Sequence, residues 1–94
     1  MAKFVCILKD EKDEKEEALS EDLLKGHIDY LRKLKQRGIL ILCGPLRDGK
    51  NNTGMVIIEG NSLEEAKQHF FEDPFITEEW YRDYSIYELQ EAII

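Results

Sequence analysis

Residues 20–38, SEDLLKGHIDYLRKLKQRG, have the pattern of a single amphipathic helix, and the elements on either side of it decide the fold. Ser20 is a favourable N-cap, and the two acidic residues after it suit the positive end of the helix dipole. Gly38 stands where a left-handed residue would end the helix. Residues three and four apart form one face that points to the core, namely Leu23, Leu24, His27, Tyr30, Leu31 and Leu34.

His27 is the titratable member of this inward face. A histidine in such a position has two interpretations. The more frequent one is a hydrogen-bonded core residue, and the other is the acid–base group of a partly buried site. The choice between them depends on which residue reaches the imidazole from elsewhere in the chain.

Short runs rich in β-forming residues flank this helix. They predict strands at residues 3–9, 39–43, 55–59 and 84–89. Gly44-Pro45 is expected to end the second strand, and Asp48-Gly49 to connect the second and third strands as a hairpin. The charged run at residues 10–17 is expected to be a solvated loop or the exposed start of a helix, and no function is assigned to it.

A second, shorter helix is predicted to begin after Ser62, with Glu65 completing a capping box. It is expected to end before Asp73-Pro74, because a residue that precedes proline disfavours helical geometry. Thr77 is expected to cap one further turn that carries Trp80. The element order is therefore β-α-β-β-α-β.

This order is typical of a ferredoxin-like α+β sandwich, in which helices cover one face of a four-stranded antiparallel sheet. The 94 residues make a single domain, 1–94. The first three predicted strands are apolar at nearly every position, so both faces of the sheet are expected to be buried. We expect a second copy to cover the free face, which gives a sheet-to-sheet homodimer. The alternative is that such short strands simply lack polar residues.

Charge and composition exclude several classes of function. A net charge of −7 disfavours nucleic acid and anionic membrane surfaces as partners. The sequence has no apolar run of about 18 residues, and it shows no export signal, which predicts a cytoplasmic protein. Cys6 and Cys43 are expected to be reduced and packed as small hydrophobic residues. We predict no metal site and no cofactor, because none of the corresponding motifs occurs.

Asp73 is the residue expected to reach His27. In this fold both helices lie on the same face of the sheet, so the corner after the second helix comes close to the middle of the first. A carboxylate at that corner would orient the imidazole and hold it in one tautomer. The alternative is that Asp73 only forms a turn or caps the residues that follow it.

The order of these motifs resembles the YCII (YciI-like) family. The matching pieces are HIDYL at 27–31, Gly38, Gly44-Pro45-Leu46, SLEEA at 62–66 and Asp73-Pro74-Phe75, within a resemblance from Phe4 to about Glu88. The resemblance implies a ferredoxin-like fold that forms dimeric α+β barrels. It also implies a His–Asp pair proposed as an active site, at the positions of His27 and Asp73.

Some relatives in this family are dehydrochlorinases of chlorinated aromatic compounds, and the wider superfamily includes muconolactone isomerases and cofactor-free monooxygenases. Many members carry an arginine shortly before the histidine. Leu23, Leu24, Lys25 and Gly26 stand there instead. Either Lys25 replaces that arginine or the ligand differs, and Arg47 is a second candidate for contact with an anion.

The sequence thus predicts a small cofactor-free enzyme with lyase- or isomerase-type acid–base chemistry on a small organic molecule, with aromatic compounds among the candidates. His27 is expected to act as general base or acid, and Asp73 to orient it. The pocket is expected to include Tyr30, Leu31, Pro45, Phe75 and Trp80. The alternative is a non-catalytic dimeric module that binds a small ligand or a protein, in which the His–Asp pair is structural.

Overall fold

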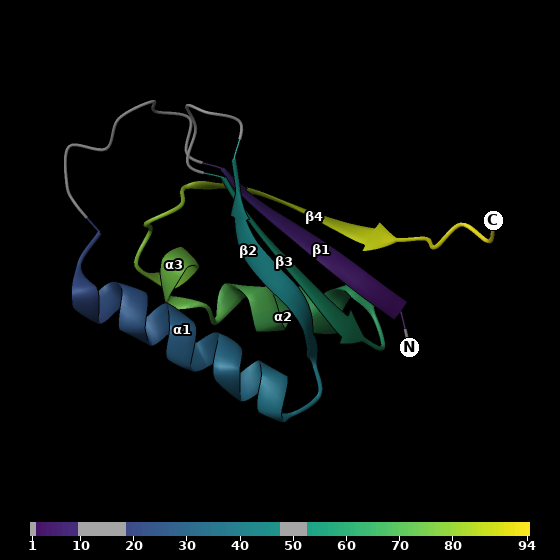
Figure 1. The fold of residues 1–94 in the computed structure, drawn as a ribbon, viewed down its shortest axis with the longest axis horizontal. Helices are drawn as coiled ribbons and strands as arrows, with labels where there is room; N and C mark the ends of the chain where they lie inside the picture. Colours follow the sequence, from purple (N-terminus) through teal and green to yellow (C-terminus); the bar gives the residue numbers. More distant parts are fainter. Residues whose placement is uncertain (1, 10–18, 48–52) are drawn as a thin grey trace.

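A computed structural model describes residues 2–9, 19–47 and 53–94 (Figure 1). The strands are β1 (Ala2–Lys9), β2 (Leu40–Leu46), β3 (Thr53–Gly60) and β4 (Asp83–Leu89). The helices are α1 (Glu21–Gln36), α2 (Leu63–Phe71) and α3 (Pro74–Thr77). The predicted ferredoxin-like α+β fold is confirmed. The charged run at 10–17 and the Asp48-Gly49 turn lie outside the described residues.

The sheet is antiparallel, with the strand order β2-β3-β1-β4. All three helices lie on one side of it (Figure 1). Alternate residues of each strand face these helices. The buried core is made of Phe4, Cys6 and Leu8 from β1, Val56 and Ile58 from β3, Leu31 and Leu34 from α1, and Ala66 and Phe70 from α2.

The opposite face of the sheet carries apolar side chains that no helix of the described chain covers. The register aligns Val5 with Ile57 on one side and with Tyr87 on the other, and it aligns Leu42 with Ile57. Tyr87 is 58% exposed and Leu42 48% exposed. We call the residues Val5, Leu42, Ile57, Tyr87 and Leu89 the outer sheet face. Among the described ranges, no helix is both long enough and apolar enough to cross a membrane.

α1 begins and ends as its sequence predicts. The Ser20 hydroxyl accepts a hydrogen bond from the Leu23 amide at 3.0 Å, which satisfies one free N–H of the first turn. Gly38 has a φ of 74°, the left-handed conformation that suits glycine after a helix. These ends fix which turn of α1 lies over the sheet, and therefore where His27 points.

The prediction that β2 ends at Gly44-Pro45 is wrong. β2 runs on to Leu46, with Pro45 opposite Gly54 of β3. β2 pairs with β3 alone and is an edge strand, where a residue without an N–H group is tolerated. The extension puts Pro45 on the same side of the sheet as Cys43, which is the side on which α1 lies.

The predicted turn capped by Thr77 is also wrong. α2 begins after Ser62 and ends before Asp73-Pro74, as expected, but the next helix starts at once with Pro74. Asp73 is its N-cap, and proline is favourable at a first helical position because its missing N–H is not needed there. Thr77 is the last residue of α3, so Trp80 lies in the irregular segment before β4.

Candidate functional site

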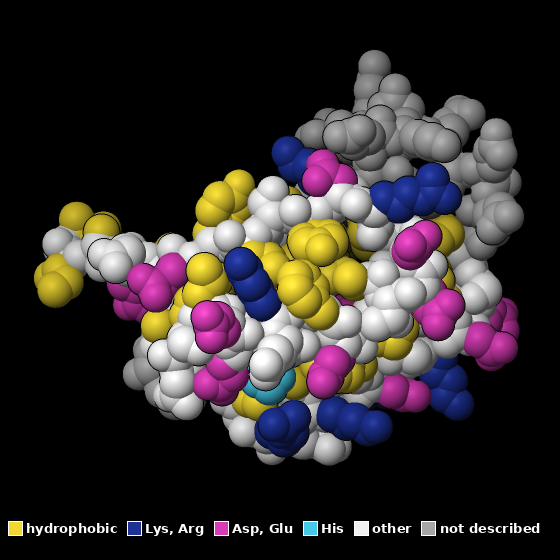
Figure 2. All heavy atoms as spheres, turned by 180° about the vertical axis from the view of Figure 1, so that it is seen from behind, with side chains coloured by type: hydrophobic (Ala, Val, Ile, Leu, Met, Phe, Trp, Pro, Cys, Tyr) yellow, Lys and Arg dark blue, Asp and Glu magenta, His cyan; other side chains and the backbone are white. Residues whose placement is uncertain are grey.

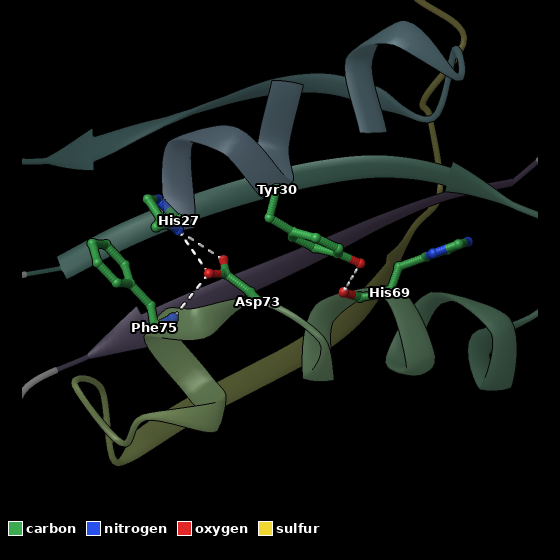
Figure 3. A network of polar contacts seen from close by, with 5 residues as sticks. All are labelled: His27, Tyr30, His69, Asp73 and Phe75. Atoms are coloured by element: carbon green, nitrogen blue, oxygen red, sulfur yellow. Dashed lines mark hydrogen bonds and ion pairs between the residues drawn. The ribbon is translucent and has the colours of Figure 1, made fainter. Parts of the chain in front are cut away.

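His27 and Asp73 meet across the seam between α1 and the corner that joins α2 to α3 (Figure 3). Nδ1 of His27 lies 2.7 Å from Oδ1 and 2.9 Å from Oδ2 of Asp73. The His27 side chain is 14% exposed and the Asp73 side chain 5% exposed. Among the residues that the structure describes, Asp73 is the only polar or charged one classed as buried. Such a buried carboxylate needs strong hydrogen-bond partners, and the imidazole supplies one.

Asp73 has a second partner within its own corner. Its Oδ1 also accepts a hydrogen bond from the backbone N–H of Phe75 at 2.9 Å, which is the capping contact of α3. Both interpretations offered by the sequence therefore apply to this carboxylate. The cap fixes the carboxylate relative to the backbone, and the fixed carboxylate faces the ring of His27.

This geometry assigns the tautomer of a neutral His27. Because a carboxylate only accepts hydrogen bonds, Nδ1 carries the proton that it donates to Asp73. Nε2 is then left with its lone pair. The ring of Phe75 stacks on the imidazole at a centroid distance of 3.7 Å and an angle of 7°, which fixes the plane of the ring. Its contacts with Trp80 and Tyr81, at centroid distances of 6.5 and 5.6 Å, extend the aromatic cluster.

A cavity of about 650 Å³ lies beside the imidazole. Its walls come from α1, β2, β3, Phe75 and the segment after α3, and His27 is part of the lining. Asp73 is not, so the carboxylate holds the ring from behind. Of the residues predicted for the pocket, Leu31, Pro45, Phe75 and Trp80 line this cavity.

Charged side chains are placed elsewhere. Among the described residues, no lysine, arginine, aspartate or glutamate lines the cavity. Lys25 and Arg47, the two candidates for contact with an anion, are outside the lining. Within the same described ranges there is also no group of three or more side chains that would hold a metal ion.

Tyr30 does not line the cavity either. Its hydroxyl donates a hydrogen bond to the backbone carbonyl of His69 at 2.7 Å (Figure 3). It also lies 3.3 Å from Oε2 of Glu72. Since Tyr30 follows His27 by three residues, its ring leaves α1 one turn further along and meets the end of α2. The helical pattern of the sequence predicts that Tyr30 points inward, but it does not predict that Tyr30 meets the carbonyl of His69.

The sequence predicts that Cys43 packs as a small hydrophobic residue, and this prediction is wrong, because Cys43 is exposed and lines the cavity. Its pKa is raised, first by burial and then by the negative charge of Asp73, while Lys35 acts in the opposite direction. The sequence does hold a signal for this position of Cys43. Cys43 and Pro45 are two residues apart, so both point to the same side of a strand. Cys6 is different, because burial in the core raises its pKa to about 12.

Comparisons with known proteins agree on the fold. The family described as the YCII-related domain matches residues 2–90. The structure is similar to a solved structure of a 5-chloro-2-hydroxyhydroquinone dehydrochlorinase from Burkholderia phenoliruptrix, in complex with 2,5-dihydroxybenzoquinone. The TM-score is 0.67 and the identity 18%, over 96% of this chain and 95% of that one. No curated protein matches the sequence.

Proposed function

The chain belongs to the YCII-related family, and on that premise we propose that it is a small enzyme for acid–base chemistry on an uncharged ring compound. One observation carries this proposal. The imidazole of His27 is held by Asp73 through Nδ1 while the same ring lines a mostly apolar cavity. A histidine sealed in the core would have no such access to a ligand.

In the proposed reaction, Nε2 of His27 takes a proton from the bound compound. The electron pair of the broken bond stays on the compound and forms a new double bond. Either a leaving group departs with its own electron pair, or the proton returns at another atom, which gives a lyase or an isomerase. Asp73 stabilises the imidazolium that forms, and the stacked ring of Phe75 contributes a cation–π contact. No cofactor takes part in this proposal.

The size and the lining of the cavity support an uncharged ring compound as the substrate. The volume is in the range of small-molecule sites, roughly 300–1,000 Å³. The lining contains aromatic and aliphatic side chains but, in the described ranges, no cationic one. The net charge of −7 also disfavours an anion. The ring-shaped ligand of the dehydrochlorinase supports a ring compound for this chain as well.

The outer sheet face supports a homodimer with the sheets packed face to face. Its apolar side chains are aligned across β2, β3, β1 and β4 by the register. Two copies related by a two-fold axis would bury these apolar side chains against each other. The two free thiols, Cys6 and Cys43, suit the reducing cytoplasm, which we propose as the location.

The first experiment is to record the ring nitrogens of His27 by ¹⁵N NMR at a pH where the ring is neutral. We expect the Nδ1–H tautomer in the unchanged protein and more of the Nε2–H tautomer in Asp73→Asn. Asparagine caps helices as well as aspartate does, so this variant keeps α3 while it removes the charge. His69 serves as the internal control, since its ring contacts Glu65 and not Asp73.

The second experiment tests the chemistry with a simple neutral probe. Cyclohex-2-enone is incubated in D₂O, and NMR follows exchange of the protons next to its carbonyl group. We expect exchange faster than in buffer, lost in His27→Gln. Binding of the probe without exchange would instead favour the non-catalytic binding module. A His27 tautomer that ignores Asp73→Asn would remove the basis of the proposal.

A further inference from the structure

Tyr30 makes the second polar contact between α1 and the end of α2 (Figure 3). His27 and Tyr30 are three residues apart and so lie on the same side of α1. Their partners, Asp73 and the carbonyl of His69, lie on the opposite side of the seam. The Tyr30 contact therefore adds a second polar restraint on how the corner after α2 is oriented against α1.

The carbonyl of His69 is available because α2 ends beside it. In a continuing helix, the amide of Asp73 would donate to this carbonyl, four residues before it. The Asp73 amide donates to the Phe70 carbonyl instead, at 3.2 Å. The hydroxyl of Tyr30 supplies the hydrogen bond that the His69 carbonyl loses, at 2.7 Å. The chain can therefore leave the helical path at Asp73 without an unsatisfied carbonyl in a partly buried place.

The hydroxyl of Tyr30 remains a donor over the working range of pH. Burial raises its pKa, and the negative charges of Glu72 and Asp73 raise it further, against the effect of Arg37. Pro74, next to Asp73, packs beside Gly26, where a Cβ added to the glycine would lie 3.5 Å from Cγ of the proline. Gly26, His27 and Tyr30 of α1 thus each contact the region where α2 ends and α3 begins.

We propose that Tyr30 is a positioning residue for the His27–Asp73 pair. Its hydroxyl holds the end of α2 on α1 and so keeps both oxygens of Asp73 at Nδ1 of His27. Tyr30 acts through Asp73 and lines no part of the cavity. The chemical role of the His27–Asp73 pair in this inference rests on the proposed function. The positioning by Tyr30 does not, because it is measured without a substrate.

The test replaces Tyr30 by phenylalanine, which keeps the ring and removes the hydroxyl. We expect Tyr30→Phe to lose the Nδ1–H majority of the neutral His27 ring and to shift the amide signal of Phe75, which donates to Asp73. Tyr84→Phe removes a phenol hydroxyl from β4 and should change neither signal. Glu72→Gln keeps the contact with His69 and should preserve the tautomer.

A wild-type tautomer and an unshifted Phe75 amide in Tyr30→Phe would overturn the proposal. If the variant does not fold in plain buffer, both proteins are measured in trimethylamine N-oxide, which favours the folded state. The failure of the proposed function is distinguishable. In that case the unchanged protein catalyses no proton exchange on cyclohex-2-enone, while Tyr30→Phe still changes the His27 tautomer.

Discussion

Nδ1 of His27 lies 2.7 and 2.9 Å from the two carboxylate oxygens of Asp73, although 46 residues separate the pair in the chain. The contact exists because the fold places α1 and the corner after α2 on one side of the same sheet. The same carboxylate caps α3. Stability and the proposed chemistry therefore depend on one side chain, and substitutions that separate its two tasks are informative.

Asp73→Ala should lower the free energy of unfolding by about 2–4 kcal/mol, because it removes a helix cap and a charge-assisted hydrogen bond together. Asp73→Asn should cost less, since asparagine retains the cap. Urea unfolding followed by circular dichroism measures both values. Equal losses in the two variants would show that the capping contact contributes little.

Gly26→Ala should raise the free energy of unfolding by about 0.5–1 kcal/mol, because alanine is the better helix former. The added methyl group meets only ordinary contacts, with Cγ of Pro74 at 3.5 Å. Gly38→Ala is the matched control and should be destabilising, because the φ of 74° there is strained for alanine. Thermal unfolding of both variants checks the two signs, and a destabilised Gly26→Ala would show that the methyl group is not accommodated beside Pro74.

Iodoacetamide at pH 8 should alkylate Cys43 slowly and leave Cys6 unmodified in the folded protein. Both thiols have a raised pKa, and the value of about 12 for Cys6 leaves almost no thiolate. The rate at Cys43 should rise with pH, because more of the reactive thiolate forms. Mass spectrometry locates the adduct, and Cys43→Ser is the control. A neutral ring compound in the cavity should slow the reaction, and a rate indifferent to saturating phenol would argue against binding there.

Tyr87→Glu and Leu42→Glu should each convert the protein to a monomer at micromolar concentration, since a charge would be buried in the proposed contact. Leu63→Glu is the matched control, because Leu63 is also exposed, at 41%, but lies at the start of α2. Sedimentation velocity measures the three variants beside the unchanged chain. An unchanged chain that sediments as a monomer would refute the dimer.

The hydrophobic face of this chain is not limited to the sheet. Figure 2 shows hydrophobic side chains gathered near the middle of the rear face, with acidic side chains around them, and hydrophobic residues at the tip of the projecting tail. Phe71 and Tyr84 pack edge to face, and each stays partly exposed.

Much of this arrangement could be predicted from the sequence, because periodicity and capping are local. The helix within residues 20–38, the order of the helices and strands along the chain, and the approach of Asp73 to His27 all follow from patterns and from the topology they imply. The position of Pro45 in a continuing strand was missed because Gly-Pro is a local turn signal, whereas an edge strand tolerates proline. The same limit applies to Tyr30, whose inward direction is visible although its partner at the end of α2 is not.

The restart of the helix at Pro74 could not be predicted for a different reason. Asp-Pro ends one helix and can also begin the next, and the two uses look alike in a sequence. The choice is made by tertiary contacts, here the donation from the Phe75 amide to Asp73 and the packing of Phe75 on His27. Prediction from the chain was therefore weakest at the corner that holds the candidate site.

The strand order β2-β3-β1-β4 also affects biosynthesis. β1 occupies an interior position, and it is translated before both of its neighbours in the sheet, β3 and β4. While a ribosome makes the intervening residues, one side of this apolar strand has no partner. Such an open edge is prone to pairing with other nascent chains, and long-range pairing closes slowly. Fast translation of the last strand, or a chaperone that shields the first, would therefore favour a high yield of folded protein.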